Sequence, residues 1–226
     1  MRYGKMVPGT FLSRPNRFIA RVETAEGEQV VHVKNKGRCR ELLTPGCRVW
    51  LEESANPARK TRYDLITVDK QGLLVNMDSQ APNRVFREWA EQGRFLPGVT
   101  AVRGEYTWGD SRLDFCLETE RGLHLVEVKG VTLETDGHAR FPDAPTERGV
   151  KHIRELQRAV AAGLDATLFF VIQMEGMQSL SPNDKTHPAF GEALRQAAAA
   201  GVRVEARGCR VTPDTLEIGE AVPVIL

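Results

Sequence analysis

A short run of charged residues near the middle of the chain has the composition of a divalent-cation site. Glu127 and Lys129 are one residue apart, so on a β-strand their side chains point to the same face. Asp114 lies on the preceding strand-like run, and a short hairpin would bring it beside Glu127. Two carboxylates and a main-chain carbonyl suffice for Mg²⁺, which prefers oxygen ligands and retains several waters. The spacing therefore predicts a metal site at Asp114 and Glu127 that suits Mg²⁺ or Mn²⁺.

Lys129 is the residue expected to assist hydrolysis beside this metal. Its ammonium group could orient or help to deprotonate the attacking water and stabilise charge on a phosphate. We therefore predict Asp114, Glu127 and Lys129 as the catalytic residues of a hydrolase, with Glu105 as a candidate third carboxylate ligand. The alternative is a surface ion pair, because Glu-x-Lys is common on solvated strands.

The elements around these residues predict an α/β domain over residues 83–226. Helices are expected at 84–93, at 146–162 with Thr146 as N-cap, and at 188–200. Strands are expected at 99–106, 112–118, 123–128, 166–172 and 202–206. The order helix, three-stranded meander, helix, strand is an α/β pattern.

Residues 1–82 predict a separate domain made of short strands with no strong helix. Strands are expected at 17–23, 30–34, 49–52, 65–68 and 73–76, with turn-forming residues between them. This pattern is typical of a small closed or partly open β-barrel. The OB-fold is the obvious member of that class, and it commonly binds single-stranded nucleic acid.

The charge is distributed unevenly between the two parts. Residues 1–83 carry a net +5 from 14 Lys/Arg and 9 Asp/Glu, and residues 84–226 carry −4 from 17 and 21. A basic first part suits phosphate backbones and an acidic second part suits a cation, although chance explains so small a difference equally well. The basic loops of the first part are predicted to contact nucleic acid, with Tyr63 or Trp50 stacking on a base; solvated turns are the alternative. These loop residues are Asn35, Lys36, Arg38, Arg40, Lys60 and Arg62.

The predicted element order and its charged residues together resemble the PD-(D/E)XK phosphodiesterase superfamily. The superfamily core is a helix, a three-stranded meander, a helix and a strand. The resemblance implies that Asp114 and Glu127 bind the metal and that Lys129 assists the nucleophile. Leu113 stands where the superfamily pattern has a proline, which has no chemical role there.

Longer motifs are similar to those of the bacterial and archaeal sugar fermentation stimulation protein family. They are VKNKGR at 33–38, SRLDF at 111–115, EVKGVTL at 127–133 and FPDAPTERGVKH at 141–152. The resemblance implies an OB-like N-terminal domain, a nuclease-like C-terminal domain, DNA binding and a role in regulating sugar metabolism. Lys36 replaces a usual threonine, and the Cys-Pro expected before Asn35 is missing.

The helix predicted at 146–162 presents a polar face opposite Val150 and Ile153. Its members fall at offsets of three, four and seven residues and are Arg148, Lys151, His152 and Glu155. If this face borders the metal site, Arg148 and Lys151 could hold phosphates and His152 could donate a proton or contact a phosphate. A solvated helix face is the alternative. Arg112, two residues before the aspartate of SRLDF, is a further predicted nucleic-acid contact.

Two functions of different classes fit the sequence. The first is a metal-dependent nuclease, and the second is a non-catalytic, DNA-binding regulator of sugar (maltose-type) metabolism that uses the nuclease fold as a platform. The intact Asp, Glu and Lys set favours the first. The sequence contains no helix-turn-helix pattern, so it does not support a conventional repressor architecture. A sugar-metabolising enzyme would need a sugar site, and the sequence offers none.

The expected partner is DNA, single- or double-stranded, with RNA as an alternative and a homodimer as a compatible assembly. The four cysteines are scattered and form no zinc-binding pattern, which fits reduced thiols. The N-terminus has no apolar signal segment, and the longest apolar run, 166–172, is too short to span a bilayer. We therefore expect a cytoplasmic protein without membrane contact.

Overall fold

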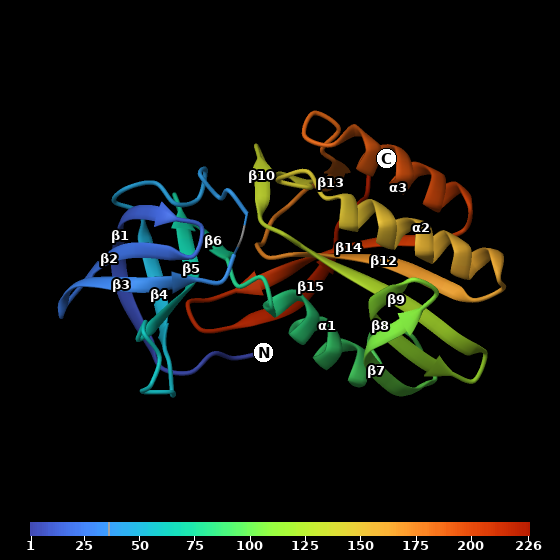
Figure 1. Cartoon of the computed structure of the whole chain (residues 1–226), viewed down its shortest axis with the longest axis horizontal. Coiled ribbons are helices and arrows are strands. Elements are labelled where there is room, and N and C mark those ends of the chain that lie inside the picture. The colour runs from blue at the N-terminus through green and yellow to red at the C-terminus, as the bar shows by residue number, and fades with distance from the viewer. Residues whose placement is uncertain (36) are drawn as a thin grey trace.

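The N-terminal part of the chain forms a closed β-barrel (Figure 1). The computed structural model describes residues 1–35 and 37–226. The barrel closes because β3 pairs with β5 and β1 pairs with β4, which gives the cyclic order β1-β2-β3-β5-β4. A further strand, β6, pairs with β5. The strands are β1 (Met6–Asn16), β2 (Ile19–Thr24), β3 (Gly27–Val33), β4 (Arg48–Glu53), β5 (Tyr63–Lys70) and β6 (Leu73–Asn76).

Alternating apolar side chains fill the barrel, as Ala20 and Val22 of β2 show. The sequence prediction did not include the long strand β1, which contains Pro8 and Pro15, residues that cannot donate to a strand ladder. The pairing explains its existence. Residues 6–9 of β1 are registered only with β4 and residues 11–16 only with β2, while Thr10 is registered with both. Each proline therefore lies where one edge of β1 has no registered strand partner.

The C-terminal part is built on a six-stranded sheet with the order β15-β14-β12-β9-β8-β7. The three central strands β14, β12 and β9 run parallel, and the outer strands pair antiparallel. These strands are β7 (Val99–Trp108), β8 (Ser111–Thr119), β9 (Gly122–Val131), β12 (Asp165–Ile172), β14 (Arg203–Val211) and β15 (Leu216–Ala221). A small second sheet contains β10 (Leu133–Thr135), β11 (His138–Phe141) and β13 (Ser179–Pro182).

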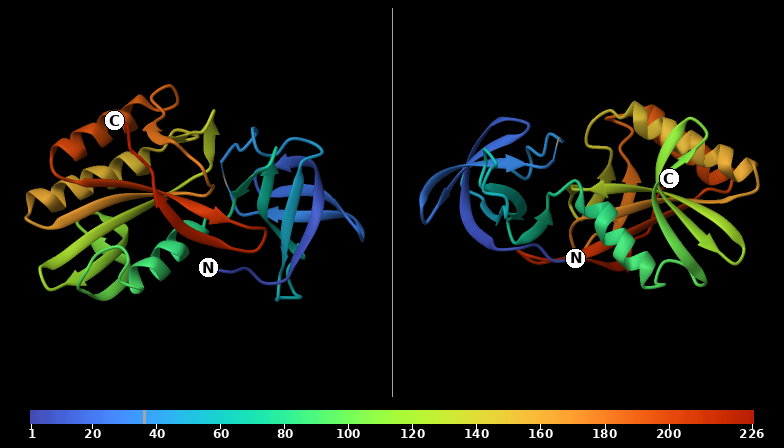
Figure 2. Two further views of the ribbon diagram at one scale, coloured as in Figure 1. Left: turned by 180° about the vertical axis from the view of Figure 1, so that it is seen from behind. Right: turned by 60° about the horizontal axis from the view of Figure 1, so that its bottom comes forward.

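Helices cover both faces of the six-stranded sheet (Figures 1 and 2). Helix α1 (Ala81–Glu91) packs on one face, and α2 (Glu147–Ala161) and α3 (Pro188–Ala199) lie side by side on the other. Phe86 of α1 is the centre of an aromatic cluster, with ring centroids 4.9–5.1 Å from those of Phe95, Phe115 and Phe169. Leu113, Leu125 and Leu168 belong to the core under α2 and α3.

The predicted fold class is confirmed: an OB-like barrel precedes an α/β domain of the helix, meander, helix, strand type. The three predicted helices are present within a few residues of their expected bounds. The prediction lacked β10, β11, β13 and β15, most of which are too short to show a repeating pattern. Among the described residues, no helix is both long and apolar enough to cross a membrane.

Polar contacts join the barrel to the α/β domain. The side-chain amide of Gln173, just after β12, donates to the main-chain oxygens of Asn76 and Asp78 at 3.0 Å. Lys70 of β5 pairs with Glu134 of β10, and Ser79 Oγ donates to the main-chain oxygen of Lys34. The segment between β6 and α1 is therefore held against both parts of the chain.

Candidate metal and nuclease site

The ladder between β8 and β9 ends at the predicted catalytic residues. The last registered pair is Phe115 with Val126, and beyond it carboxylates accept the main-chain hydrogen bonds. Asp114 Oδ2 accepts from the main-chain N–H of Val128 at 2.8 Å, and Glu127 Oε2 accepts from that of Asp114 at 3.3 Å. The two carboxylates are thus held side by side where the strands stop pairing.

Neighbouring side chains fix both carboxylates. Asn83, in the first turn of α1, donates through Nδ2 to Asp114 Oδ1 at 2.8 Å. Lys129 Nζ donates to Glu127 Oε1 at 2.6 Å, as expected for side chains on one face of a strand. The structure therefore brings Asp114, Glu127 and Lys129 together, each on the element where the sequence placed it.

Helix α2 contributes His152 to the same cluster. The His152 ring donates from Nδ1 to Glu127 Oε1, and its Nε2 lies 3.3 Å from Arg148 Nε. A guanidinium can only donate, so Nε2 accepts and the proton belongs on Nδ1. His152 is buried, with 5% of its surface exposed, and packs against the site. Glu155 is also buried, at 3%, but its carboxylate pairs with Arg158 at 2.9 Å.

The cap of α2 contributes to the position of His152. Thr146 Oγ1 accepts from the N–H of Gly149 at 3.1 Å, which satisfies one of the unpaired donors of the first turn. Replacing Thr146 with Ala is expected to lower the free energy of unfolding by about 1 kcal/mol. Chemical denaturation of both proteins measures this difference, and a serine at the same position should restore most of the loss.

Burial and charge shift the two carboxyl groups in opposite directions. Burial raises the pKa of Asp114, and the neighbouring Glu127 carboxylate adds to the rise. Burial alone would raise the pKa of Glu127, but the hydrogen bond from His152 and the charge of Lys129 outweigh it and lower that pKa. Glu127 is therefore the stable anion of the pair, and a cation placed between the two would favour ionised Asp114 as well.

The donor set fits a hard divalent cation. The two carboxylates are close together and largely withdrawn from water, and a cation would offset their mutual repulsion. Among the described residues, no group of three or more His, Cys, Asp and Glu side chains is arranged to hold a metal. The predicted third ligand, Glu105, has a side chain that is 75% exposed and pairs with Arg112 at 3.5 Å. The structure therefore gives no support to Glu105 as a ligand.

The predicted nucleic-acid contacts fall into several places. Asn35 lines a cavity between the two domains, and Arg38 and Arg40 line a neighbouring one. Lys36 lies outside the described residues. Lys60 is exposed, whereas Arg62 is engaged by Glu53 and Glu26.

On the C-terminal domain, Arg148 and Lys151 are exposed beside the site. Lys151 Nζ donates to the main-chain oxygen of Asp110 at 2.7 Å. The suggestion that Tyr63 stacks on a base is wrong, because only 1% of its surface is exposed. Its ring belongs to the barrel core, and Arg62 covers it.

Two residues that organise the site were missed by sequence reasoning. Asn83 marked only the start of a helix in the sequence, and its contact with Asp114 depends on how α1 docks. Arg14 donates to the main-chain oxygens of Asn35, Gly37 and Arg38 at 2.7–3.0 Å and holds the first basic loop in place. Arg14 is half-buried in the structure, and nothing local in the sequence distinguishes it from the exposed arginines.

Comparison with known proteins gives matches over nearly the whole chain. Residues 12–77 match the model of the SfsA N-terminal OB domain, and residues 80–215 match that of the sugar fermentation stimulation protein RE domain. The sugar fermentation stimulation protein homolog of Desulfitobacterium hafniense (strain DSM 10664 / DCB-2) is 55% identical over 226 residues, covering 100% of this chain and 99% of the relative. That of Clostridium beijerinckii is 47% identical and covers 100% of both chains.

A solved structure has the same architecture. Pyrococcus furiosus SfsA, whose structure was determined in complex with Ca²⁺, superposes with a TM-score of 0.90 at 28% sequence identity. The match covers 100% of this chain and 98% of the solved one. The family models, the full-length relatives and this shared fold agree with the motifs seen in the sequence, and the chain belongs to the sugar fermentation stimulation protein family.

Proposed function

We propose that this protein is a DNA-binding phosphodiesterase that requires a divalent metal ion. The observation that carries the proposal is the convergence of Asp114, Glu127 and Lys129 at the point where β8 and β9 stop pairing. Basic residues around this point and on the barrel would hold the phosphate backbone. The family's RE domain and the Ca²⁺ bound by the P. furiosus relative support a divalent cation, and we favour Mg²⁺ or Mn²⁺ for catalysis.

Asp114 and Glu127 would hold the cation. A bound divalent ion lowers the pKa of water and offsets charge that develops on the phosphate. Lys129 would orient the attacking water and stabilise the phosphate oxygens, because its ammonium group already lies 2.6 Å from Glu127. His152 and Asn83 would keep the two carboxylates in place through the hydrogen bonds described above.

The direct test is cleavage of labelled single- and double-stranded DNA, and of RNA, with Mg²⁺ or Mn²⁺. Wild type is compared with Asp114→Ala and Lys129→Ala. We expect metal-dependent cleavage that both substitutions abolish. DNA binding without cleavage by any of the three proteins would contradict the nuclease and favour the non-catalytic, DNA-binding regulator.

Metal binding can be measured without catalysis. A cation that binds only the folded protein stabilises it by about 2.7 kcal/mol when its concentration is roughly 100 times its Kd. We expect Ca²⁺, Mg²⁺ or Mn²⁺ to raise the Tm of the wild type relative to EDTA, and this shift to disappear in Asp114→Ala. An equal shift in both proteins would place the bound metal elsewhere.

A further inference from the structure

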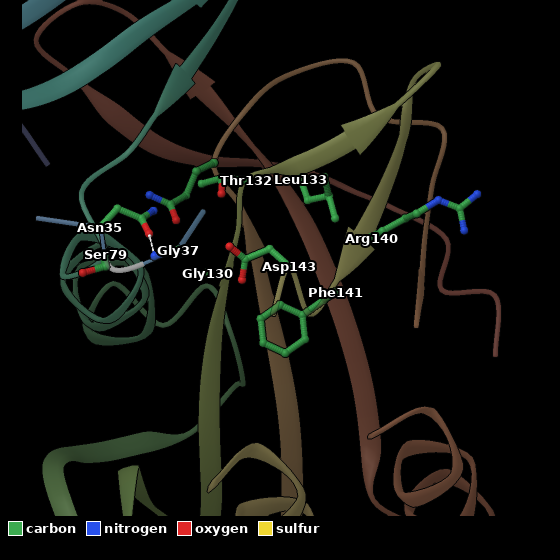
Figure 3. A pocket seen from close by; sticks show the side chains of 10 residues that line it. Asn35, Gly37, Ser79, Gly130, Thr132, Leu133, Arg140, Phe141 and Asp143 are labelled. Atoms are coloured by element: carbon green, nitrogen blue, oxygen red, sulfur yellow. Dashed lines mark hydrogen bonds between the residues drawn. The ribbon is translucent and has the colours of Figure 1, made fainter. Parts of the chain in front are cut away.

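A cavity of about 350 Å³ lies between the barrel and the α/β domain (Figure 3). Asn35, Gly37 and Ser79 form its wall on the N-terminal side. Phe141 and Asp143, from the end of β11 and the loop that follows, line it on the C-terminal side. The cavity therefore has amide, hydroxyl and carboxylate groups near one aromatic ring.

Close packing of main chain fixes the walls of this cavity. A Cβ atom at Gly37 would overlap the Asp143 carboxylate, so glycine allows the barrel loop to touch the C-terminal domain. A Cβ at Gly130 would lie 2.6 Å from both Gln173 Oε1 and Pro82 Cγ. A side chain at Gly130 would displace Gln173 or α1 within the α/β domain, and one at Gly37 would displace the Asp143 carboxylate where the two domains meet.

The cavity is lined at Gly130 by β9, the strand that also carries Glu127 and Lys129. Gly130 follows Lys129 in that strand. Strand residues advance by about 3.3 Å, so the main chain of Glu127 is roughly 10 Å from that of Gly130. A phosphate held at Asp114 and Glu127 would thus be only one or two nucleotides from a group in the cavity.

A basic cavity of about 480 Å³ adjoins the first one on the barrel surface. Gly37 lines both. None of the described residues that line the basic cavity is acidic, and four of them are arginines: Arg14, Arg17, Arg38 and Arg40. Arg14 holds the loop through main-chain oxygens, whereas Arg17, Arg38 and Arg40 are exposed.

We infer that the two cavities form one groove for single-stranded DNA, in which the interdomain cavity takes an unstacked nucleotide next to the scissile phosphate. This inference rests on the proposed nuclease function and narrows its substrate to a strand that is unpaired at this position. A volume of about 350 Å³ is at the lower end of the range of about 300–1,000 Å³ for pockets that hold one small ligand, so the interdomain cavity suits a single unstacked nucleotide and not a duplex. Arginines suit the phosphates, and a base in the cavity would meet the Phe141 ring and the polar groups of Asn35 and Asp143.

The basic part of the groove is tested by binding without cleavage. Fluorescence anisotropy in EDTA, and again in Ca²⁺, compares a labelled single strand with the same sequence as a duplex. The wild type should prefer the single strand. Charge reversal in Arg38→Glu/Arg40→Glu should weaken single-strand binding by about tenfold or more, because a hydrogen bond to a charged group contributes about 1.5–3 kcal/mol.

Arg121→Glu is the control for one reversed charge and is also compared with Arg38→Glu and Arg40→Glu as single substitutions. This exposed arginine lies on the turn between β8 and β9, at the opposite end of β9 from Gly130. Its reversal should leave the affinity nearly unchanged. Equal weakening by Arg121→Glu and by the double substitution, or equal affinity of the wild type for duplex and single strand, would overturn the inference.

The interdomain cavity is tested by filling it. Ser79 is exposed and lines the cavity, so Ser79→Leu adds volume there without entering the core. Ser79→Ala is the matched control, because it removes the same hydroxyl without filling the space. We expect Ser79→Leu, but not Ser79→Ala, to weaken single-strand binding, with a similar small decrease in Tm in both because both lose the hydrogen bond to Lys34. Full affinity in Ser79→Leu would overturn the cavity assignment. Because these assays need no cleavage, absence of nuclease activity would not be confused with failure of the groove.

Discussion

Replacing Glu127 with Gln is expected to lower metal-dependent cleavage by at least about 10²-fold, the scale of losing one electrostatic group at a reaction centre. The substitution keeps the shape of the side chain but removes the charge that holds Lys129 at 2.6 Å and that would bind the cation. Single-turnover cleavage at saturating Mg²⁺ or Mn²⁺ measures the effect separately from DNA binding.

Glu105→Gln is the matched control for Glu127→Gln. Glu105 lies on the neighbouring strand β7, and its exposed side chain contacts Arg112 rather than the site. We expect its rate to stay within about twofold of wild type, the effect of a surface change of less than 0.5 kcal/mol. Equal losses in both variants would make Glu105 a ligand after all, and an active Glu127→Gln would remove Glu127 from catalysis.

Replacing Phe86 with Ala is expected to lower the free energy of unfolding by about 3–5 kcal/mol. Phe86 is fully buried, and its ring contacts Phe95, Phe115 and Phe169 under α1. The same helix carries Asn83, so a looser α1 would also release the hydrogen bond to Asp114. The surviving folded protein should therefore bind metal more weakly.

Urea denaturation followed by circular dichroism measures the Phe86→Ala effect. Phe18→Ala is the control, because 46% of Phe18 is exposed on the barrel surface. Its expected cost is within about 0.5 kcal/mol. A loss near that value for Phe86→Ala would mean that the aromatic cluster contributes little to holding α1 on the sheet.

The candidate catalytic residues could be predicted because each depends on local pattern. Strand alternation placed Glu127 and Lys129 on one face, and the hairpin brought Asp114 beside them. The Asn83 contact could not be predicted in this way, since it depends on the docking of a helix 31 residues away in sequence. Glu105 shows the same limit. It lies on β7 opposite Asp114 of β8, but its φ is 54° and its side chain points into solvent.

The barrel shows why a pattern of short alternating runs predicts the class of architecture better than it predicts each individual strand. Short alternating runs identified its later strands, whereas β1 was hidden by its prolines. Only the strand pairing of the barrel shows that β1 changes partner from β4 to β2 at Thr10. One edge of β1 therefore has no registered partner before Thr10, and the other edge has none after it. Tyr63 was misread for a similar reason, because its neighbours are charged and only the closed barrel buries its ring.

The main-chain N–H of Val128 donates to the side-chain carboxylate of Asp114, not to a main-chain oxygen of the neighbouring strand β8. That amide hydrogen consequently reports on the carboxylate. If a cation draws Asp114 Oδ2 away, the exchange of this single hydrogen with deuterium should quicken, while the amides of residues 123–126, paired within the ladder, keep their protection. One position in the backbone can therefore record occupancy of the site in the intact protein, before any substrate is cut.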